Sequence, residues 1–143
     1  MLRNLFANMG PVTKNLLIIN VAMLIISGIA ETQGIDLGEM LGMHYFKSSS
    51  FRPFQIVTHM FMHANIMHLV GNMFGLVFFG SQLERAWDSK RFLIFYLITG
   101  FGALFLYILV NHFHIVQLSS GIAPEVMDLI FQSDIVGLNN MIN

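Results

Sequence analysis

Three long segments of the chain contain no Asp, Glu, Lys or Arg, and they restrict its fold more than any other feature. They cover residues 15–30, 53–83 and 92–124. A helix that crosses a bilayer needs about 20 predominantly apolar residues, which the second and third segments exceed and the first approaches. Only 10% of the 143 residues are charged, whereas soluble domains carry about 25%. We therefore predict an all-α integral membrane protein.

The apolar runs and the residues that flank them define the expected layout of a single partial membrane domain covering 1–143. Three transmembrane helices are predicted at about 15–31, 64–83 and 92–112, with an outer loop at 32–63 and an outer tail at 113–143. The first segment also fits a cleaved signal peptide, because it has a basic start, a short apolar run and a small-residue exit. Asn20 within the run and the two longer spans that follow favour a transmembrane helix.

The basic residues are divided unevenly between the two ends of these spans. One side would carry Arg3, Lys14, Arg85, Lys90 and Arg91, and the other Lys47 and Arg52. Because cytoplasmic loops are enriched in Lys and Arg, we expect a cytoplasmic N-terminus, in a bacterial inner membrane. The net charge of −1 and the lack of a basic stripe argue against nucleic acid as a partner. The lipid bilayer is the expected partner.

The second span carries polar side chains at helical spacing. His68 and Asn72 are four residues apart and so share one face of a helix, while His63 precedes them where the apolar run begins. Polar groups inside a span are costly and usually face protein or a wet cavity. An imidazole N–H and a carboxamide NH₂ are both donors. If they converge, they can stabilise an oxygen atom that gains negative charge in a transition state.

Small residues accompany these polar ones. Gly71 and Gly75 are also four residues apart, a spacing that lets another helix approach closely, and Gly100 and Gly102 provide small residues in the third span. Close helix packing and a polar cavity are therefore expected in the same region.

The pattern His63-x₄-His68-x₃-Asn72 at the start of the second span resembles the rhomboid family of intramembrane serine proteases. Three more features are similar to that family over essentially the whole chain. They are Phe51-Arg52-Pro53-Phe54, where the family usually has a Trp-Arg pair, Glu84 at the end of the second span, and Gly100-x-Gly102-Ala103 in the third. The resemblance implies a rhomboid-like helical bundle that hydrolyses peptide bonds in or beside the transmembrane segments of its substrates. We expect neither a cofactor nor a metal.

The resemblance also implies a role for each matching residue. His68 and Asn72 are expected to donate hydrogen bonds in an oxyanion hole, and His63 to support them by hydrogen bonding. Arg52 would shape a half-submerged hairpin on the outer face. Glu84 and the four glycines would be structural positions, and the substitution of Phe51 for the usual tryptophan affects only the details of the hairpin.

The catalytic dyad of the family has no counterpart in the sequence. Rhomboids use a serine in a Gly-x-Ser-Gly turn that opens the fourth span, paired with a histidine on the sixth, because a serine hydroxyl needs an adjacent base. Leu118-Ser119-Ser120-Gly121 lacks the first glycine, and no histidine follows it. We therefore expect the chain to be the N-terminal part of a rhomboid protease, ending before the nucleophile and inactive by itself.

Three other interpretations fit the same residues. A rhomboid-like pseudoprotease would bind membrane clients without cutting them. His59, His63 and His68 could together supply three imidazoles to zinc, although no carboxylate or thiol lies nearby in the sequence. His68 and Asn72 could also be ordinary interhelical hydrogen-bonding residues.

Overall fold

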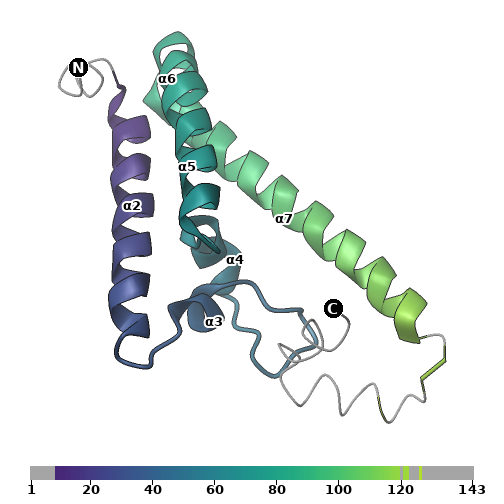
Figure 1. Cartoon of the computed structure of the whole chain (residues 1–143). Helices are drawn as coiled ribbons and strands as arrows, with labels where there is room; N and C mark the ends of the chain where they lie inside the picture. The colour runs from purple at the N-terminus through teal and green to yellow at the C-terminus, as the bar shows by residue number, and fades with distance from the viewer. Residues whose placement is uncertain (1–8, 120, 123–125, 127–143) are drawn as a thin grey trace.

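The structure is a computed structural model that describes residues 9–119, 121, 122 and 126, and this part of the chain is helical without strands. Its elements are α2 (Pro11–Glu31), α3 (Leu37–Leu41), α4 (Gln55–Thr58), the 3₁₀ helix η1 (His59–Phe61), α5 (Ile66–Gly75), the π-helical turn η2 (Leu76–Gly80), α6 (Ser81–Trp87) and α7 (Ser89–Ser119). Figure 1 shows α2 beside the continuous α5–α6 helix, and α7 diverging from both. The predicted all-α class is confirmed.

Three helices are long and apolar enough to cross a membrane, as predicted. They cover Pro11–Glu31, Ile66–Trp87 and Ser89–Gln117. The third helix begins earlier than expected and continues beyond residue 112, so the first part of the expected tail is helical. The charged connection is also shorter than its sequence suggests, because only Asp88, with a positive φ of 74°, separates α6 from α7. The tail beyond Ser119 lies almost wholly outside the described residues.

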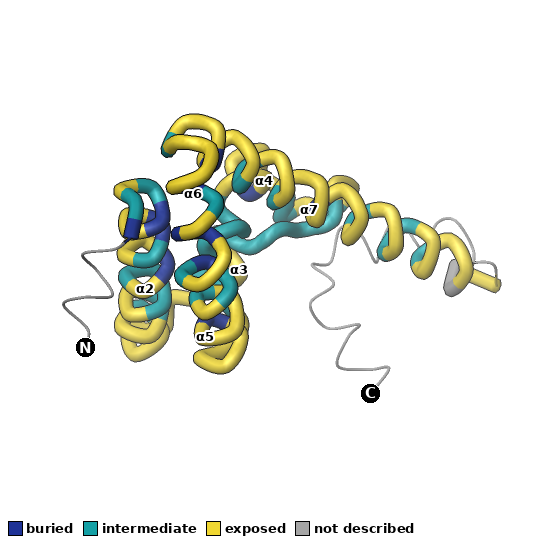
Figure 2. Tube along the Cα trace, turned by 90° about the horizontal axis from the view of Figure 1, so that it is seen from above, coloured by how far each residue is buried: buried dark blue, intermediate teal, exposed yellow. Residues whose placement is uncertain are grey.

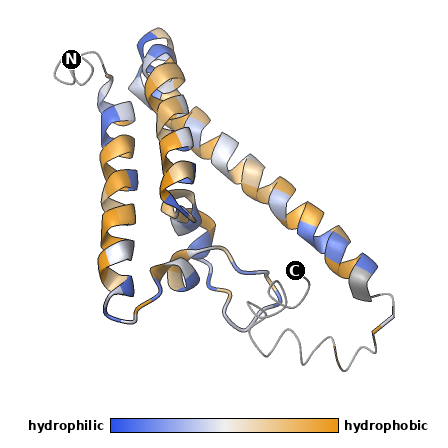
Figure 3. Ribbon diagram, in the orientation of Figure 1, coloured by the Kyte–Doolittle hydropathy of each residue, from blue (hydrophilic) through white to orange (hydrophobic). Residues whose placement is uncertain are grey.

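The outer faces of the long helices are apolar and exposed, as Figures 2 and 3 show. Ile25, Phe105 and Phe113 are each more than half exposed. In water such a surface would drive association, whereas in a bilayer it faces acyl chains. The chain is therefore an integral membrane protein.

One small core joins the three spanning helices. Leu16 of α2, Leu76 at the start of η2 and Phe92 of α7 are buried against one another. Each helix contributes one residue, so this apolar layer fixes how the three are aligned along their length.

The π-helical turn η2 changes which face of the second span meets α2. In a straight α-helix, residues eight apart such as Leu76 and Glu84 point about 80° apart, whereas the extra residue of one π turn reduces this to about 20°. Both side chains are buried, Leu76 in the core and Glu84 against the start of α2. The π turn therefore allows one helix to direct an apolar and an acidic side chain to the same neighbour.

Glu84 closes the end of the bundle at which α2 begins. Its two carboxylate oxygens accept hydrogen bonds from the Val12 and Thr13 N–H groups, at 2.9 and 2.8 Å. The Ser89 hydroxyl donates a third hydrogen bond to it, at 2.6 Å. The first N–H groups of a helix have no partner within the helix and favour a negative charge nearby. Glu84 thus caps α2 from the second span and binds the start of α7.

The segment between α2 and α5 is held together by buried side chains rather than by regular structure. Gln55 is 1% exposed; it donates to the carbonyls of Met40 and Ser50 and accepts from the N–H of Arg52. The Thr58 hydroxyl donates to the Leu41 carbonyl at 2.6 Å. These contacts fold the predicted outer loop onto itself.

A second contact joins this loop to the far end of α7. The Tyr45 hydroxyl lies 2.9 Å from Nδ1 of His112, and the Phe46 ring lies beside the same imidazole. Residues 67 positions apart are brought together by this hydrogen bond. The loop therefore bridges the gap that opens between α5 and α7.

Candidate active site

The position of His68 is set by the residue that caps its helix. Asn65 has extended backbone angles, and its side-chain oxygen accepts a hydrogen bond from the His68 N–H at 2.8 Å. Asparagine is a favoured N-cap because it satisfies one of the unpaired N–H groups of the first turn. This cap starts α5 at Ile66 and places His68 in its first turn, with Asn72 one turn further along the same face.

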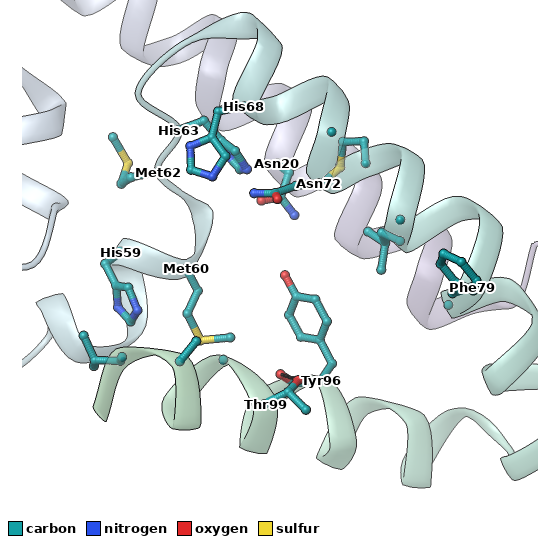
Figure 4. Close-up of a pocket in the computed structure, with 18 of the residues that line it drawn as sticks. Asn20, His59, Met60, Met62, His63, His68, Asn72, Phe79, Tyr96 and Thr99 are labelled. Atoms are coloured by element: carbon teal, nitrogen blue, oxygen red, sulfur yellow. Dashed lines mark hydrogen bonds between the residues drawn. The ribbon is translucent and has the colours of Figure 1, made fainter. Parts of the chain in front are cut away.

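His68 and Asn72 line one cavity of about 1030 Å³, which lies mainly between α5–α6 and α7. Figure 4 shows both side chains, with His63, along one side of this space. Methionines and aromatic rings supply most of the remaining wall, including Met60, Met73, Phe79 and Phe95. The two predicted donors are therefore brought to the same cavity, whose other walls are largely apolar.

His63 lies against His68. The two rings meet edge to face, with centroids 5.3 Å apart. His63 is half-buried, and its Nδ1 has no hydrogen-bond partner among the described residues. Burial lowers the pKa of His63, and the neighbouring His68 lowers it further. A neutral imidazole at this position retains one donor and one acceptor nitrogen.

His59 lines the same cavity but has its own partner. Its Nδ1 lies 2.9 Å from the Gln55 carbonyl oxygen, one turn back along α4. Within residues 9–119 and the few described after them, no group of three or more His, Cys, Asp or Glu side chains is arranged to hold a metal ion.

The glycines predicted to be structural fall into two kinds. A Cβ at Gly100 would meet the side chain of Met60, so the loop packs directly against α7 there. At Gly71, Gly75 and Gly102 nothing lies within 4 Å of where a Cβ would stand. The close helix approach expected at Gly71 and Gly75 is therefore not made by any part of the chain that the structure describes, and Gly71 and Gly75 border the cavity instead.

The two charged positions predicted to be structural also differ. Glu84 is buried and joins three helices, as described above. Arg52 is exposed, and its guanidinium donates to the carbonyls of Ser49 and Phe51 within its own loop, at 2.7 and 2.9 Å. Arg52 therefore stabilises a local turn of the outer loop.

Sequence reasoning did not identify Asn20 and Tyr96 as neighbours of the predicted donors. Both line the same cavity, although they come from α2 and α7. Asn20 is 1% exposed, and the Tyr96 phenol interacts with its side chain. The sequence did show Asn20 as a polar residue within an apolar span, but it does not show which side chains of the other helices Asn20 faces.

Residues 50–138 match the model of the Rhomboid domain, which covers more than half of the chain. The chain belongs to the rhomboid family. In this rhomboid chain, the matched region begins in the outer loop and includes the second and third spans.

Curated relatives include plant and bacterial proteins. RHOMBOID-like protein 12, mitochondrial, of Arabidopsis thaliana is 31% identical over 71% of this chain and 29% of its own length. RHOMBOID-like protein 6, mitochondrial, of the same plant is 46% identical over 34% of this chain and 16% of its own length. Rhomboid protease GlpG of Haemophilus influenzae is 23% identical over 68% of this chain and 50% of its own length. No solved structure gives a significant match.

This rhomboid chain thus spans half or less of the length of these three relatives.

Proposed function

We propose that this chain forms the oxyanion-binding part of an intramembrane serine protease that cleaves peptide bonds in or beside the transmembrane segments of its substrates. The supporting observation is that His68 and Asn72 lie one turn apart on a membrane-spanning helix and line a single cavity beside it. A tetrahedral intermediate of acyl transfer carries its charge on one oxygen. Two N–H donors in an apolar surrounding stabilise that charge more strongly than they would in water.

His63 supports this arrangement through its contact with His68. Because burial lowers its pKa, His63 is neutral at pH 7 and so does not place a positive charge beside the donor ring. Its edge-to-face packing restricts the rotation of the His68 ring. A donor held in one orientation costs less reorganisation when the transition state forms.

The nucleophile and the general base would come from outside the residues described here. The family places its serine at the start of a further span, and the cavity between α5 and α7 has the size and the apolar lining to receive part of a helix. Gly71 and Gly75 present no side chain to this space, which would let such a helix approach α5 closely. By itself this chain is proposed to be inactive.

The basic residues support a cytoplasmic N-terminus. Lys14, Arg85, Lys90 and Arg91 lie at the end of the bundle closed by Glu84, whereas Lys47 and Arg52 lie at the end that carries the loop. Short cytoplasmic loops carry the excess of basic residues. We therefore propose that the Glu84 end lies at the cytoplasmic face of a bacterial inner membrane and that the cavity opens toward the opposite face. Two of the plant relatives are named as mitochondrial proteins.

The experiment that tests this function uses the complete protein translated from the full reading frame, reconstituted with a transmembrane peptide substrate. Asn72→Ala should reduce turnover by about 10²- to 10³-fold, which is the usual effect of removing one oxyanion donor. Thermal stability should be retained, because Asn72 is exposed to the cavity. The matched control is Asn15→Ala, at an exposed asparagine of α2, which should leave turnover unchanged.

Two outcomes would contradict the proposal. Unchanged turnover in Asn72→Ala would remove the oxyanion role. If a fluorophosphonate probe fails to label the complete protein, no activated serine is present, and a pseudoprotease that binds membrane clients becomes the better interpretation.

A further inference from the structure

Asn20 of α2 is the least expected side chain of the spanning helices. It is 1% exposed and lies in the middle of an apolar helix. Its Nδ2 donates to the Leu16 carbonyl at 2.7 Å, which fixes the orientation of the carboxamide. Its Oδ1 is buried and has no hydrogen-bond partner among the described residues. A buried acceptor without a donor is costly, and more so inside a bilayer, so it calls for a function.

The register of the three helices shows what Asn20 faces. Leu16, Leu76 and Phe92 form one apolar layer. Because α2 and α7 run opposite to α5, one turn toward the outer end adds four residues on α2 and α7 and removes four on α5. This step leads from the apolar layer to Asn20, Asn72 and Tyr96. The next layer is therefore polar in all three helices.

The side chains agree with this register. Asn20, Asn72 and Tyr96 all line the same cavity. Figure 4 shows the Tyr96 hydroxyl directed toward the two carboxamides. The Tyr96 phenol interacts with the Asn20 side chain, whose Oδ1 still has no hydrogen-bond partner among the described residues.

The two carboxamides are chemically complementary. Asn20 has a buried acceptor without a donor among the described residues, and the amide group of Asn72, which is exposed to the cavity, has two N–H donors. One N–H is enough to bind an oxyanion, so the other is free for a positioning contact. Hydrogen bonds of this kind are often long in the unliganded state and shorten when the reacting group binds.

We propose that Asn20 is a positioning residue, whose carboxamide oxygen accepts a hydrogen bond from Asn72 and so directs the second Asn72 N–H into the cavity. This inference rests on the proposed function, because it assigns Asn20 a role only through Asn72. Asn20 does not touch the reacting atoms. The Tyr96 phenol contacts the same Asn20 carboxamide.

The test is a double-mutant cycle in the complete reconstituted protein. Asn20→Leu keeps the side-chain volume and removes the acceptor. We expect it to lower kcat about five- to tenfold, the effect of one modest hydrogen bond, with KM and the thermal midpoint retained. In the Asn72→Ala background, the same change should have less than a twofold effect, because the residue through which it acts is gone.

Asn15→Leu is the matched control, since Asn15 is exposed on the same helix, and it should leave kcat unchanged in both backgrounds. Equal losses from Asn20→Leu in the two backgrounds, or no loss in either, would overturn the positioning role. A fall in the thermal midpoint that accompanies the loss of kcat would assign Asn20 a purely structural role and overturn it as well.

Failure of the proposed function has a different signature. If Asn72→Ala has wild-type turnover, or if the wild-type protein does not hydrolyse the substrate, both the oxyanion role and the positioning role are refuted. If Asn72→Ala is slow and Asn20→Leu is not, only the positioning role is refuted.

Discussion

The two ends of the helical bundle are built differently. At the end where α2 begins, the Glu84 carboxylate of α6 accepts hydrogen bonds from α2 and α7. The Leu16–Leu76–Phe92 layer packs the same three helices together. At the other end α7 diverges, a cavity of about 1030 Å³ opens, and the contacts across it are made by the loop. The predicted donors line the open end. Rigid packing at one end thus leaves the other end free to hold a polar, accessible site, as functional sites often require.

The largest effect on stability is expected at the closed end. Glu84→Ala leaves two N–H groups of α2 and the Ser89 hydroxyl without their acceptor. We expect a loss of about 2–4 kcal/mol in the free energy of unfolding, the combined effect of a lost cap and buried unpaired donors. Thermal unfolding of the complete protein in detergent measures it. Gln82→Ala, at an exposed position of α6, is the control; equal midpoints for the two variants would mean that the carboxylate does not hold the helices together.

A pair of glycine substitutions compares the two ends along one helix. A Cβ at Gly10 would clash with the Glu84 carboxylate, whereas nothing lies within 4 Å of a Cβ at Gly28. Gly10→Ala should therefore destabilise by about 1–3 kcal/mol, as overpacking does. Gly28→Ala should stabilise by up to about 1 kcal/mol, because alanine is the better helix former. Thermal unfolding in detergent measures both effects. If Gly10→Ala raises the thermal midpoint, the close contact between Gly10 and the Glu84 carboxylate is contradicted.

A smaller effect is expected from the contact that bridges the open end. Tyr45→Phe removes the hydrogen bond to His112 and keeps the ring. The expected loss is about 0.5–1.5 kcal/mol, with faster proteolytic cleavage of the 32–53 loop. Tyr107→Phe, at an exposed tyrosine on the same helix as His112, controls for the loss of a hydroxyl. Unchanged cleavage in Tyr45→Phe would show that the loop does not depend on α7.

The smallest effect is a pH dependence at the open end. The folded state lowers the pKa of His63, so the unfolded chain binds the proton more readily. Stability should therefore be full above the ordinary imidazole value of about 6.5 and fall as the pH drops below it. His63→Gln should reduce the change in thermal midpoint between pH 5 and 7. His114→Gln, at an exposed histidine of α7, is the control, and an unchanged slope in His63→Gln would assign the pH dependence to another group.

The spanning helices and the polar pair could be predicted from local pattern. A charge-free run of about 20 residues requires a helix in a bilayer, since no other single segment satisfies its backbone there. The four-residue spacing of His68 and Asn72 placed them on one face of that helix. The ends of the helices were less predictable, because in the charge-rich segment 84–91 every residue except Asp88 is helical.

The contacts between helices depended on information that the local sequence does not contain. Nothing in the spacing shows that Glu84 caps α2, because its partners are the N–H groups of residues more than 70 positions away. No pattern in the sequence marks Gln55 as the buried residue around which the loop folds.

The sequence alone determined that the chain is helical, that it crosses the membrane, and that one face of its second span is polar, since each of these follows from periodicity and composition. Only the tertiary structure decided which side chains meet that face. The π turn, the apolar layer and the Glu84 cap set the register between helices, and that register brings Asn20 and Tyr96 into one layer with Asn72. Register depends on the packing of several helices at once, so it cannot be read from any one of them.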